Sequence, residues 1–318
     1  MKKKQKQSIL MSLLMLLITA VALTTASYAW FSVNEAVTLS NLDIQVEAAE
    51  GIQVSTDAQT WRAAITVADI LDPGPNYPGH TNQIPSQLKP VSTIGSQSLG
   101  NFEFFEGTLI EDATTTLTTT ESPAEAAGDV GSYMAFDLFI RSATTEDIYL
   151  ASPTALTYAP LDAEDSVGLE LATRVAFFNR GTQSDNDPAG ARALAGGTSS
   201  TQVIWEPNAL ENTPTAIIDG ATAGTKEPYY GVKAAGTGLE LENFDTQTTH
   251  FELVTTITPD TDASPFDTTN PDNIIFTVTP GITKVRVYIW IEGQDVDCSN
   301  DISLGVGTVA ATIRFIKL

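Results

Sequence analysis

One stretch decides the fold class of this chain: Lys284-Val285-Arg286-Val287-Tyr288-Ile289-Trp290-Ile291. Its valines and isoleucines occupy every second position, which is the period of a β-strand and not of a helix. A second stretch, residues 133–140, is apolar at nearly every position. Such a run is expected for a strand that is buried inside a sandwich.

Shorter runs of the same character lie on both sides of these two stretches, and turn residues separate them. We predict strands at 52–55, 63–67, 102–109, 148–151, 169–178, 202–206, 251–257, 274–278 and 309–316. No run has the pattern of an amphipathic helix. We therefore predict an all-β chain, in which residues 51–318 form a jelly-roll-like β-sandwich with long loop excursions near 70–100, 179–200 and 220–242.

The N-terminus has the layout of an export signal. Four lysines (Lys2, Lys3, Lys4 and Lys6) precede the uncharged run Ile9–Leu23, and small residues follow. We interpret residues 1–29 as a helical signal peptide, with cleavage after Ala29 or after Ala26. The alternative is an uncleaved membrane anchor, because Ile9–Phe31 is long enough to span a bilayer.

Residues 30–50 read as a strand that begins with aromatic residues. Its candidate anchor positions are Trp30, Phe31, Val33, Val37 and Leu39. After Leu39 the apolar residues move to the even positions, which indicates a β-bulge or a bend at Ser40–Asn41. The strand is either the first strand of its own domain or a donor strand that completes the sheet of a neighbouring copy.

The composition narrows the classes of partner. The 318 residues carry 39 acidic and 16 basic side chains, a formal net charge of −23. Such a surface argues against nucleic acid as a partner and limits membrane contact to the N-terminal segment. The one cysteine, Cys298, is expected to be buried as a small apolar residue, and pairing with another molecule is the alternative.

The usual catalytic motifs are missing. The two histidines, His80 and His250, stand outside any zinc-protease pattern, and Gly95–Gly100 departs from a nucleophile elbow at Ser96. We therefore expect the protein not to be an enzyme. Trp205 and Trp290 lie within strand patterns, so we interpret them as core residues, with sugar-stacking platforms as the alternative.

One acidic loop is a candidate metal site. Its oxygen-bearing side chains alternate as at the start of a calcium loop, and the candidate ligands are Asp295, Asp297, Ser299 and Asp301. Asn300 and Val306 stand where an EF-hand has its glycine and its closing glutamate. A solvated acidic turn is the alternative, and calcium is the only cofactor that the sequence suggests.

Several blocks of the chain resemble a known family. The junction Tyr28-Ala29-Trp30-Phe31-Ser32 with Asn34, and the blocks 203–208 and 287–298, look like Gram-positive, clostridial-type exported surface proteins with a SipW-dependent-type signal segment. The junction is more distantly similar to the TasA/camelysin matrix fibre proteins. That resemblance implies jelly-roll subunits, a dedicated signal peptidase, and fibres in which one subunit's N-terminal strand completes the next subunit's sheet.

These observations favour an extracellular or cell-surface structural subunit of a fibre, pilus-like filament or biofilm matrix, with other copies of itself as partners. The first alternative is a monomeric binding module, of carbohydrate or adhesin type, that uses loops 72–87 and 220–242. The second is a secreted hydrolase with an unfamiliar carboxylate site, which no motif specifies.

Overall fold

A computed structural model describes residues 37–46, 52–71, 77–93, 95, 97–98, 101–110, 116–151, 154–160, 170–195, 202–206, 229–232, 236–240, 251–254, 274–293 and 307–317. Several sequence predictions lie outside these ranges. They are the signal segment, the anchors Trp30, Phe31 and Val33, the calcium ligands Asp295, Asp297, Ser299 and Asp301, and Cys298.

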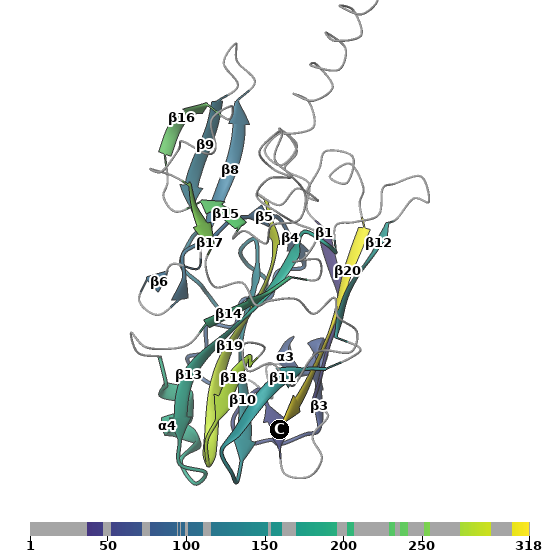
Figure 1. Cartoon of the computed structure of the whole chain (residues 1–318), viewed down its shortest axis with the longest axis vertical. Coiled ribbons are helices and arrows are strands. Elements are labelled where there is room, and N and C mark those ends of the chain that lie inside the picture. The colour runs from purple at the N-terminus through teal and green to yellow at the C-terminus, as the bar shows by residue number, and fades with distance from the viewer. Residues whose placement is uncertain are drawn as a thin grey trace, which may run out of the picture.

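Among the described residues, two large sheets form the body of the molecule (Figure 1). The first sheet has the order β18-β11-β20-β1-β3, with β12 also paired to β20 and β4 to β1. Its strands are β1 (Val37–Val46), β3 (Ala64–Thr66), β4 (Gln87–Leu88), β11 (Glu146–Leu150), β12 (Ala155–Pro160), β18 (Phe276–Val278) and β20 (Gly307–Lys317).

The second sheet has the order β14-β13-β19-β10-β2, and β5 also pairs with β19. Its strands are β2 (Gln53–Ser55), β5 (Pro90–Val91), β10 (Met134–Ser142), β13 (Thr173–Gln183), β14 (Gln202–Trp205) and β19 (Gly281–Glu292). β19 is its central strand and pairs antiparallel with β10 on one side and with β13 on the other. The predicted all-β class is confirmed.

Smaller elements complete the described part of the chain. They are a three-stranded sheet of β8 (Phe105–Ile110), β9 (Thr116–Glu121) and β16 (Gly236–Glu240), the pairs β15 (Tyr229–Val232) with β17 (Phe251–Val254) and β6 (Gln97–Ser98) with β7 (Asn101–Phe102), and the helices α3 (Val67–Leu71) and α4 (Pro188–Ala193). The predicted loop excursions thus contain regular structure. β13 extends to Gln183, where the sequence analysis had placed a loop from 179, and the Asp187 carboxylate caps α4 by accepting a hydrogen bond from the Gly190 amide at 2.8 Å.

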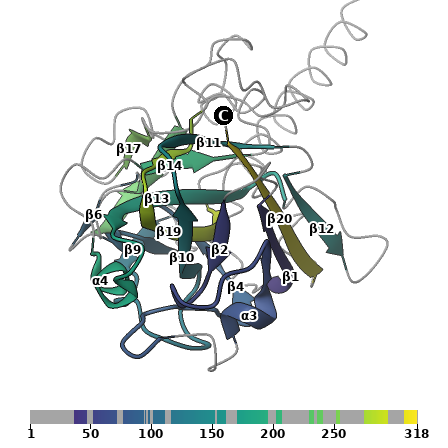
Figure 2. The same ribbon diagram turned by 90° about the horizontal axis from the view of Figure 1, so that it is seen from below.

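The two large sheets face each other across an apolar core (Figure 2). β19 contributes its alternating residues to this core, and β20 contributes the matching set from the opposite sheet: Val285, Val287, Ile289 and Ile291 from the one, and Val309, Ala311, Ile313 and Phe315 from the other. All eight are at most 1 % exposed. The strand period of the sequence therefore reflects one face of β19 that packs against the first sheet.

The other face of β19 is buried as well. Tyr288 and Trp290 project into an aromatic cluster that includes Phe102, Phe104 and Phe178. Trp290 is 0 % exposed and Trp205, in the main core, is 2 % exposed. The interpretation of both tryptophans as core residues is confirmed.

The charged residues of β19 lie on this second face and are paired there. The Asp137 carboxylate of β10 accepts a contact from Lys284 Nζ at 3.4 Å and from Arg286 Nη1 at 3.1 Å, and Glu125 contacts Arg286 Nη2 at 2.5 Å. Burial alone would raise the pKa of Asp137, but Arg286 and Lys284 hold that pKa below its ordinary value. Asp137 is therefore ionised at neutral pH.

Replacing Asp137 with asparagine should destabilise the fold strongly. The change keeps the shape of the side chain but leaves Lys284 and Arg286 buried with one carboxylate fewer, which typically costs about 3–5 kcal/mol. The free energy of unfolding in urea measures the effect. The matched control is Asp185→Asn, because Asp185 is 62 % exposed and its contact to Arg141 is at 3.7 Å, so its loss should cost less than about 1 kcal/mol. Equal losses in the two variants would contradict this account of the second face.

Candidate functional site

The first described strand, β1, lies inside the first sheet and not at its edge. It runs parallel to β20, with Thr38–Val46 opposite Thr308–Phe315. On its other side it pairs antiparallel with β3 and β4. We call the β1–β20 contact, with its flanking β3 and β4 pairings, the β1 seam. Figure 1 shows β1 and β20 side by side.

A bulge sets the register of the β1 seam. Leu39 pairs with Val309, Asn41 pairs with Ala310, and Ser40 is the extra residue between them. The bulge predicted at Ser40–Asn41 is therefore confirmed. Without it, the apolar positions before and after Ser40 would fall on opposite faces of the sheet.

The register matches the apolar positions of β1 to the buried positions of β20. The pairs are Leu39 with Val309, Leu42 with Ala311, Ile44 with Ile313 and Val46 with Phe315. The four β20 partners are all nearly inaccessible to solvent. A chain without β1 would expose part of this core and the backbone groups along one side of β20, which is the situation that strand addition relieves.

The predicted site residues are only partly placed by these observations. Val37 pairs with Leu88 of β4, and Leu39 pairs with Val309 of β20. The other anchor positions and the candidate calcium loop lie outside the described residues, so their roles stay predictions. In the part of the chain that the structure describes, no helix is long and apolar enough to cross a bilayer. The same residues contain no group of three or more histidine, cysteine or acidic side chains that is placed to hold a metal ion.

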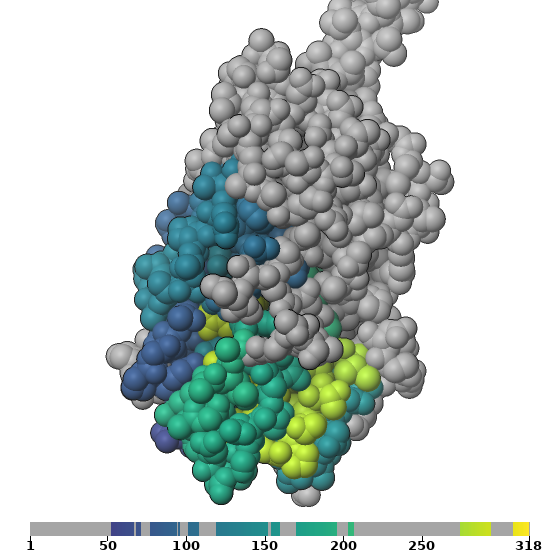
Figure 3. Space-filling view, turned by 90° about the vertical axis from the view of Figure 1, so that its left-hand side faces the viewer, coloured from purple at the N-terminus to yellow at the C-terminus, as the bar shows by residue number. Residues whose placement is uncertain are grey.

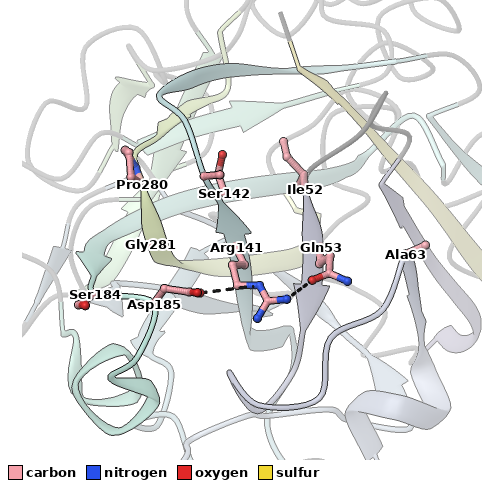
Figure 4. Close-up of a pocket in the computed structure, with 10 residues that line it drawn as sticks. Ile52, Gln53, Ala63, Arg141, Ser142, Ser184, Asp185, Pro280 and Gly281 are labelled. Atoms are coloured by element: carbon pink, nitrogen blue, oxygen red, sulfur yellow. Dashed lines mark hydrogen bonds and ion pairs between the residues drawn. The ribbon is translucent and has the colours of Figure 1, made fainter.

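A second feature is an open groove of about 970 Å³ at the end of the second sheet (Figure 4). Arg141 lies in its centre, between Gln53 of β2 and Asp185 in the turn after β13. The Arg141 guanidinium also lies over the ring of Trp61, 4.8 Å from the ring centroid. The groove therefore offers charged and amide groups next to an aromatic ring.

This groove was not predicted from the sequence. Its residues come from β2, from the end of β10, from the turn after β13 and from the start of β19, which are distant in the sequence and meet through strand pairing. The predicted binding loops 72–87 and 220–242 contribute none of the described lining residues. One feature of the sequence could have indicated it. The apolar strand 134–142 ends in polar residues, and Arg141 follows seven buried residues there.

Comparisons with known proteins found no relative of this chain. No protein-family model, curated protein or solved structure matches this chain. The resemblance to exported surface proteins therefore stays a prediction, and a functional proposal has to rest on the geometry.

The β1 seam predicts a pattern of amide hydrogen exchange. Because Asp43–Gln45 of β1 pair with β20 on one side and with β3 on the other, their amides should exchange as slowly as those of β20. Exchange of the chain from Trp30, followed by mass spectrometry of peptides, measures this. The short edge pairing of β4 is the internal comparison and should exchange faster. Fast exchange throughout β1 would contradict the seam.

Proposed function

We propose that this protein is an extracellular structural subunit that assembles with copies of itself by donating its N-terminal strand. One observation carries the proposal. The interior position next to β20 is filled by β1, whose covalent connection to the rest of the described fold runs only through residues 47–51. The finer features of the proposal are a jelly-roll-like sandwich and a preceding export signal that a dedicated signal peptidase removes.

Strand exchange would cost little at this position. A β1 strand from another copy can make the same backbone hydrogen bonds to β20, β3 and β4 that the chain's own strand makes. The contacts of the closed chain and of the exchanged chain are then equivalent, so concentration and the linker decide between them. The linker is Glu47-Ala48-Ala49-Glu50-Gly51, which leads from the first sheet to β2 in the second sheet.

The β1–β20 pairing is the one extended parallel pairing in the described sheets, and this supports a role for β1 that differs from that of the other strands. The other parallel pairing, of β5 with β19, covers two residues, and the remaining pairings are antiparallel, as in sheets that hairpin connections commonly build. A parallel neighbour needs a long crossover or a strand supplied from elsewhere. In this chain β1 and β20 are separated by 260 positions of sequence, from Val46 to Gly307.

Electron microscopy of two chain lengths tests the assembly. The chain from Trp30 to Leu318 should form filaments, and a chain that begins at Leu42 should not, because it lacks the first half of β1 and the anchor positions before it. Negative-stain images and sedimentation measure the outcome. Filaments from both chains, or single molecules from both, would sink the strand-donation mechanism.

A variant that lacks Ser40 tests whether assembly requires the register of β1 against β20 or only the presence of β1. The deletion keeps every apolar residue of β1 but puts Val37 and Leu39 out of phase with the positions after the bulge. We expect assembly to fall at least about tenfold, since one slipped residue reverses the faces of half the strand. Replacement of Ser40 with threonine is the matched control and should assemble like the parent chain. Normal filaments from the deletion variant would contradict a register-specific seam.

The groove around Arg141 favours a second candidate function, a monomeric carbohydrate-binding or adhesin-type module. Guanidinium, amide and carboxylate groups beside an indole ring are suited to hydroxyl-rich ligands. Glycan-array binding by the chain from Trp30 tests it, with Arg141→Ala expected to abolish binding and Arg62→Ala expected to retain it. Absence of binding to any glycan would remove this candidate.

A further inference from the structure

A second, smaller cavity lies on the outer face of the second sheet and carries an excess of positive charge. Its volume is about 300 Å³, and it is lined by residues of β10, β13 and β19, of the segment 77–81, and of α4 and the residues after it. Figure 3 looks onto the side of the molecule where segment 170–195, which includes α4 (green), lies beside segment 274–293 (yellow-green). Four cations line the cavity: Arg180, Arg192, Lys284 and Arg286.

Two of these cations have carboxylate partners. Lys284 and Arg286 share Asp137, and Arg286 also contacts Glu125. The carboxylates of Asp137 and Glu125 are thus both paired with cations of β19. In the described part of the chain, neither Arg180 nor Arg192 forms an ion pair, so these two positive charges have no carboxylate in direct contact, although Asp137 and Glu125 attract Arg180 from a distance.

Arg180 is the more unusual of the two, because it is 6 % exposed. Its guanidinium donates hydrogen bonds to the Ala195 carbonyl at 2.6 Å and to Asn101 Oδ1 at 2.7 Å, and it lies 4.4 Å from the centroid of the Phe178 ring. All these partners are neutral. Burial lowers the pKa of Arg180, which is the mark of a buried charge whose desolvation is not fully offset.

Arg192 completes the cationic lining from α4. Only its Nε atom donates a hydrogen bond within the described residues, to the Asp57 carbonyl at 2.7 Å, and its guanidinium faces the Tyr77 ring at 5.5 Å from the centroid. Neither of its Nη atoms donates a hydrogen bond to another described residue, so both can donate to a bound solute. Arg192 is half-buried, so a solute that enters the cavity can reach it.

The hydroxyl groups nearby remain neutral. Burial raises the pKa of both Tyr77 and Tyr288, so neither phenol supplies a negative charge at physiological pH. Tyr77 donates a hydrogen bond to Asp137, which leaves the cavity with neutral hydroxyl groups and with the guanidinium groups of Arg180 and Arg192, neither of which forms an ion pair among the described residues. The described lining thus sets four cations against the one carboxylate of Asp137, which Lys284 and Arg286 already contact.

We propose that this cavity is a binding site for a small, doubly charged oxyanion of the sulfate or hydrogen phosphate type, either free or as the terminal group of a larger molecule. Two guanidinium groups that form no ion pair among the described residues match two negative charges, and Arg is the side chain best suited to such oxygens. A cavity of about 300 Å³ holds the anion together with several waters. The inference is independent of strand donation.

The site also fits the charge of the whole molecule. With a net charge of −23, the protein repels anions at long range. An anion site on such a chain therefore requires concentrated local cations, and this cavity gathers four of the sixteen lysine and arginine residues. Short-range, desolvated contacts retain their strength in salt better than surface contacts do.

Calorimetric titration of the full-length protein, kept in a mild non-ionic detergent because of its apolar N-terminal run, tests the site. The probes are sodium sulfate, sodium phosphate and a phosphorylated monosaccharide, each compared with sodium chloride at equal ionic strength. We expect saturable binding of sulfate or phosphate that chloride does not reproduce. Tighter binding of the phosphorylated sugar than of inorganic phosphate would identify the terminal group of a larger molecule as the ligand.

Three variants assign the binding to the cavity. Arg192→Gln and Arg180→Gln should each weaken sulfate and phosphate binding by about tenfold or more, because each removes a charged donor. Arg62→Gln is the matched control, since Arg62 is exposed and pairs with Asp69, and its affinity should stay within about twofold of the parent. If Arg180→Gln does not fold, the affinity of Arg192→Gln for sulfate and phosphate tests the site, because Arg192 is only half-buried.

Two results would overturn the proposal. One is binding of sulfate and phosphate no stronger than that of chloride at equal ionic strength. The other is an unchanged affinity in Arg192→Gln, which would place the anion elsewhere on the protein. Filament formation by the parent chain is measured separately, so failure of this site and failure of strand donation give different readouts.

Discussion

The burial of β19 on both faces is the constraint on which the rest of the structure depends. Every residue from Gly281 to Glu292 is buried. On one face, aliphatic side chains pack against the first sheet, and on the other the strand carries two cations and two large aromatic residues. Burying Lys284 and Arg286 is tolerable only because Asp137 and Glu125 are buried beside them. The same requirement recurs at the strand's end, where Arg174 contacts Glu206 at 3.0 Å and Glu292 at 3.2 Å.

This covered second face explains two features that lie far apart in the chain. The segments around Phe102 and Tyr77 must cross the outer face of the second sheet to exclude water from its charges and rings. Where they do so incompletely, a cavity remains that is lined by the cations left over from the pairing, Arg180 and Arg192. The first sheet depends on a different contact, because β1 fills the place beside β20 and thereby sets the order of the strands.

Sequence reasoning predicted the strands well because strand period and apolar content are local. The clearest cases are β10, β19 and β20, and the bulge at Ser40 was visible as a change of phase in the apolar pattern. Sequence reasoning did not find the groove at Arg141 or the cationic cavity. Both gather residues from strands that lie more than 100 positions apart, and their meeting is set by pairing partners that no local pattern encodes.

The loops were the second weakness of the sequence-based predictions. Residues 179–200 read as a loop because Asp, Asn and Gly are abundant there, yet β13 continues to Gln183 because it pairs with β19 as far as Ile282. Tertiary pairing thus overrode local propensity. Short strands such as β15 and β16 escaped notice for the same reason, since glycine-rich segments pair only where a partner strand is presented.

The central claim is that β1 of one copy pairs with β20 of another. Cysteines placed at the paired positions Asp43 and Thr312, with Cys298 replaced by serine, report this pairing as a disulfide. Assembly from equal amounts of isotopically heavy and light chains, followed by oxidation and mass spectrometry, distinguishes the two origins of the strand. Strand donation predicts mixed heavy–light disulfides in about half of the linked pairs, as random pairing of equal populations requires. Disulfides formed only within single chains would show that each domain keeps its own β1 and would contradict the account.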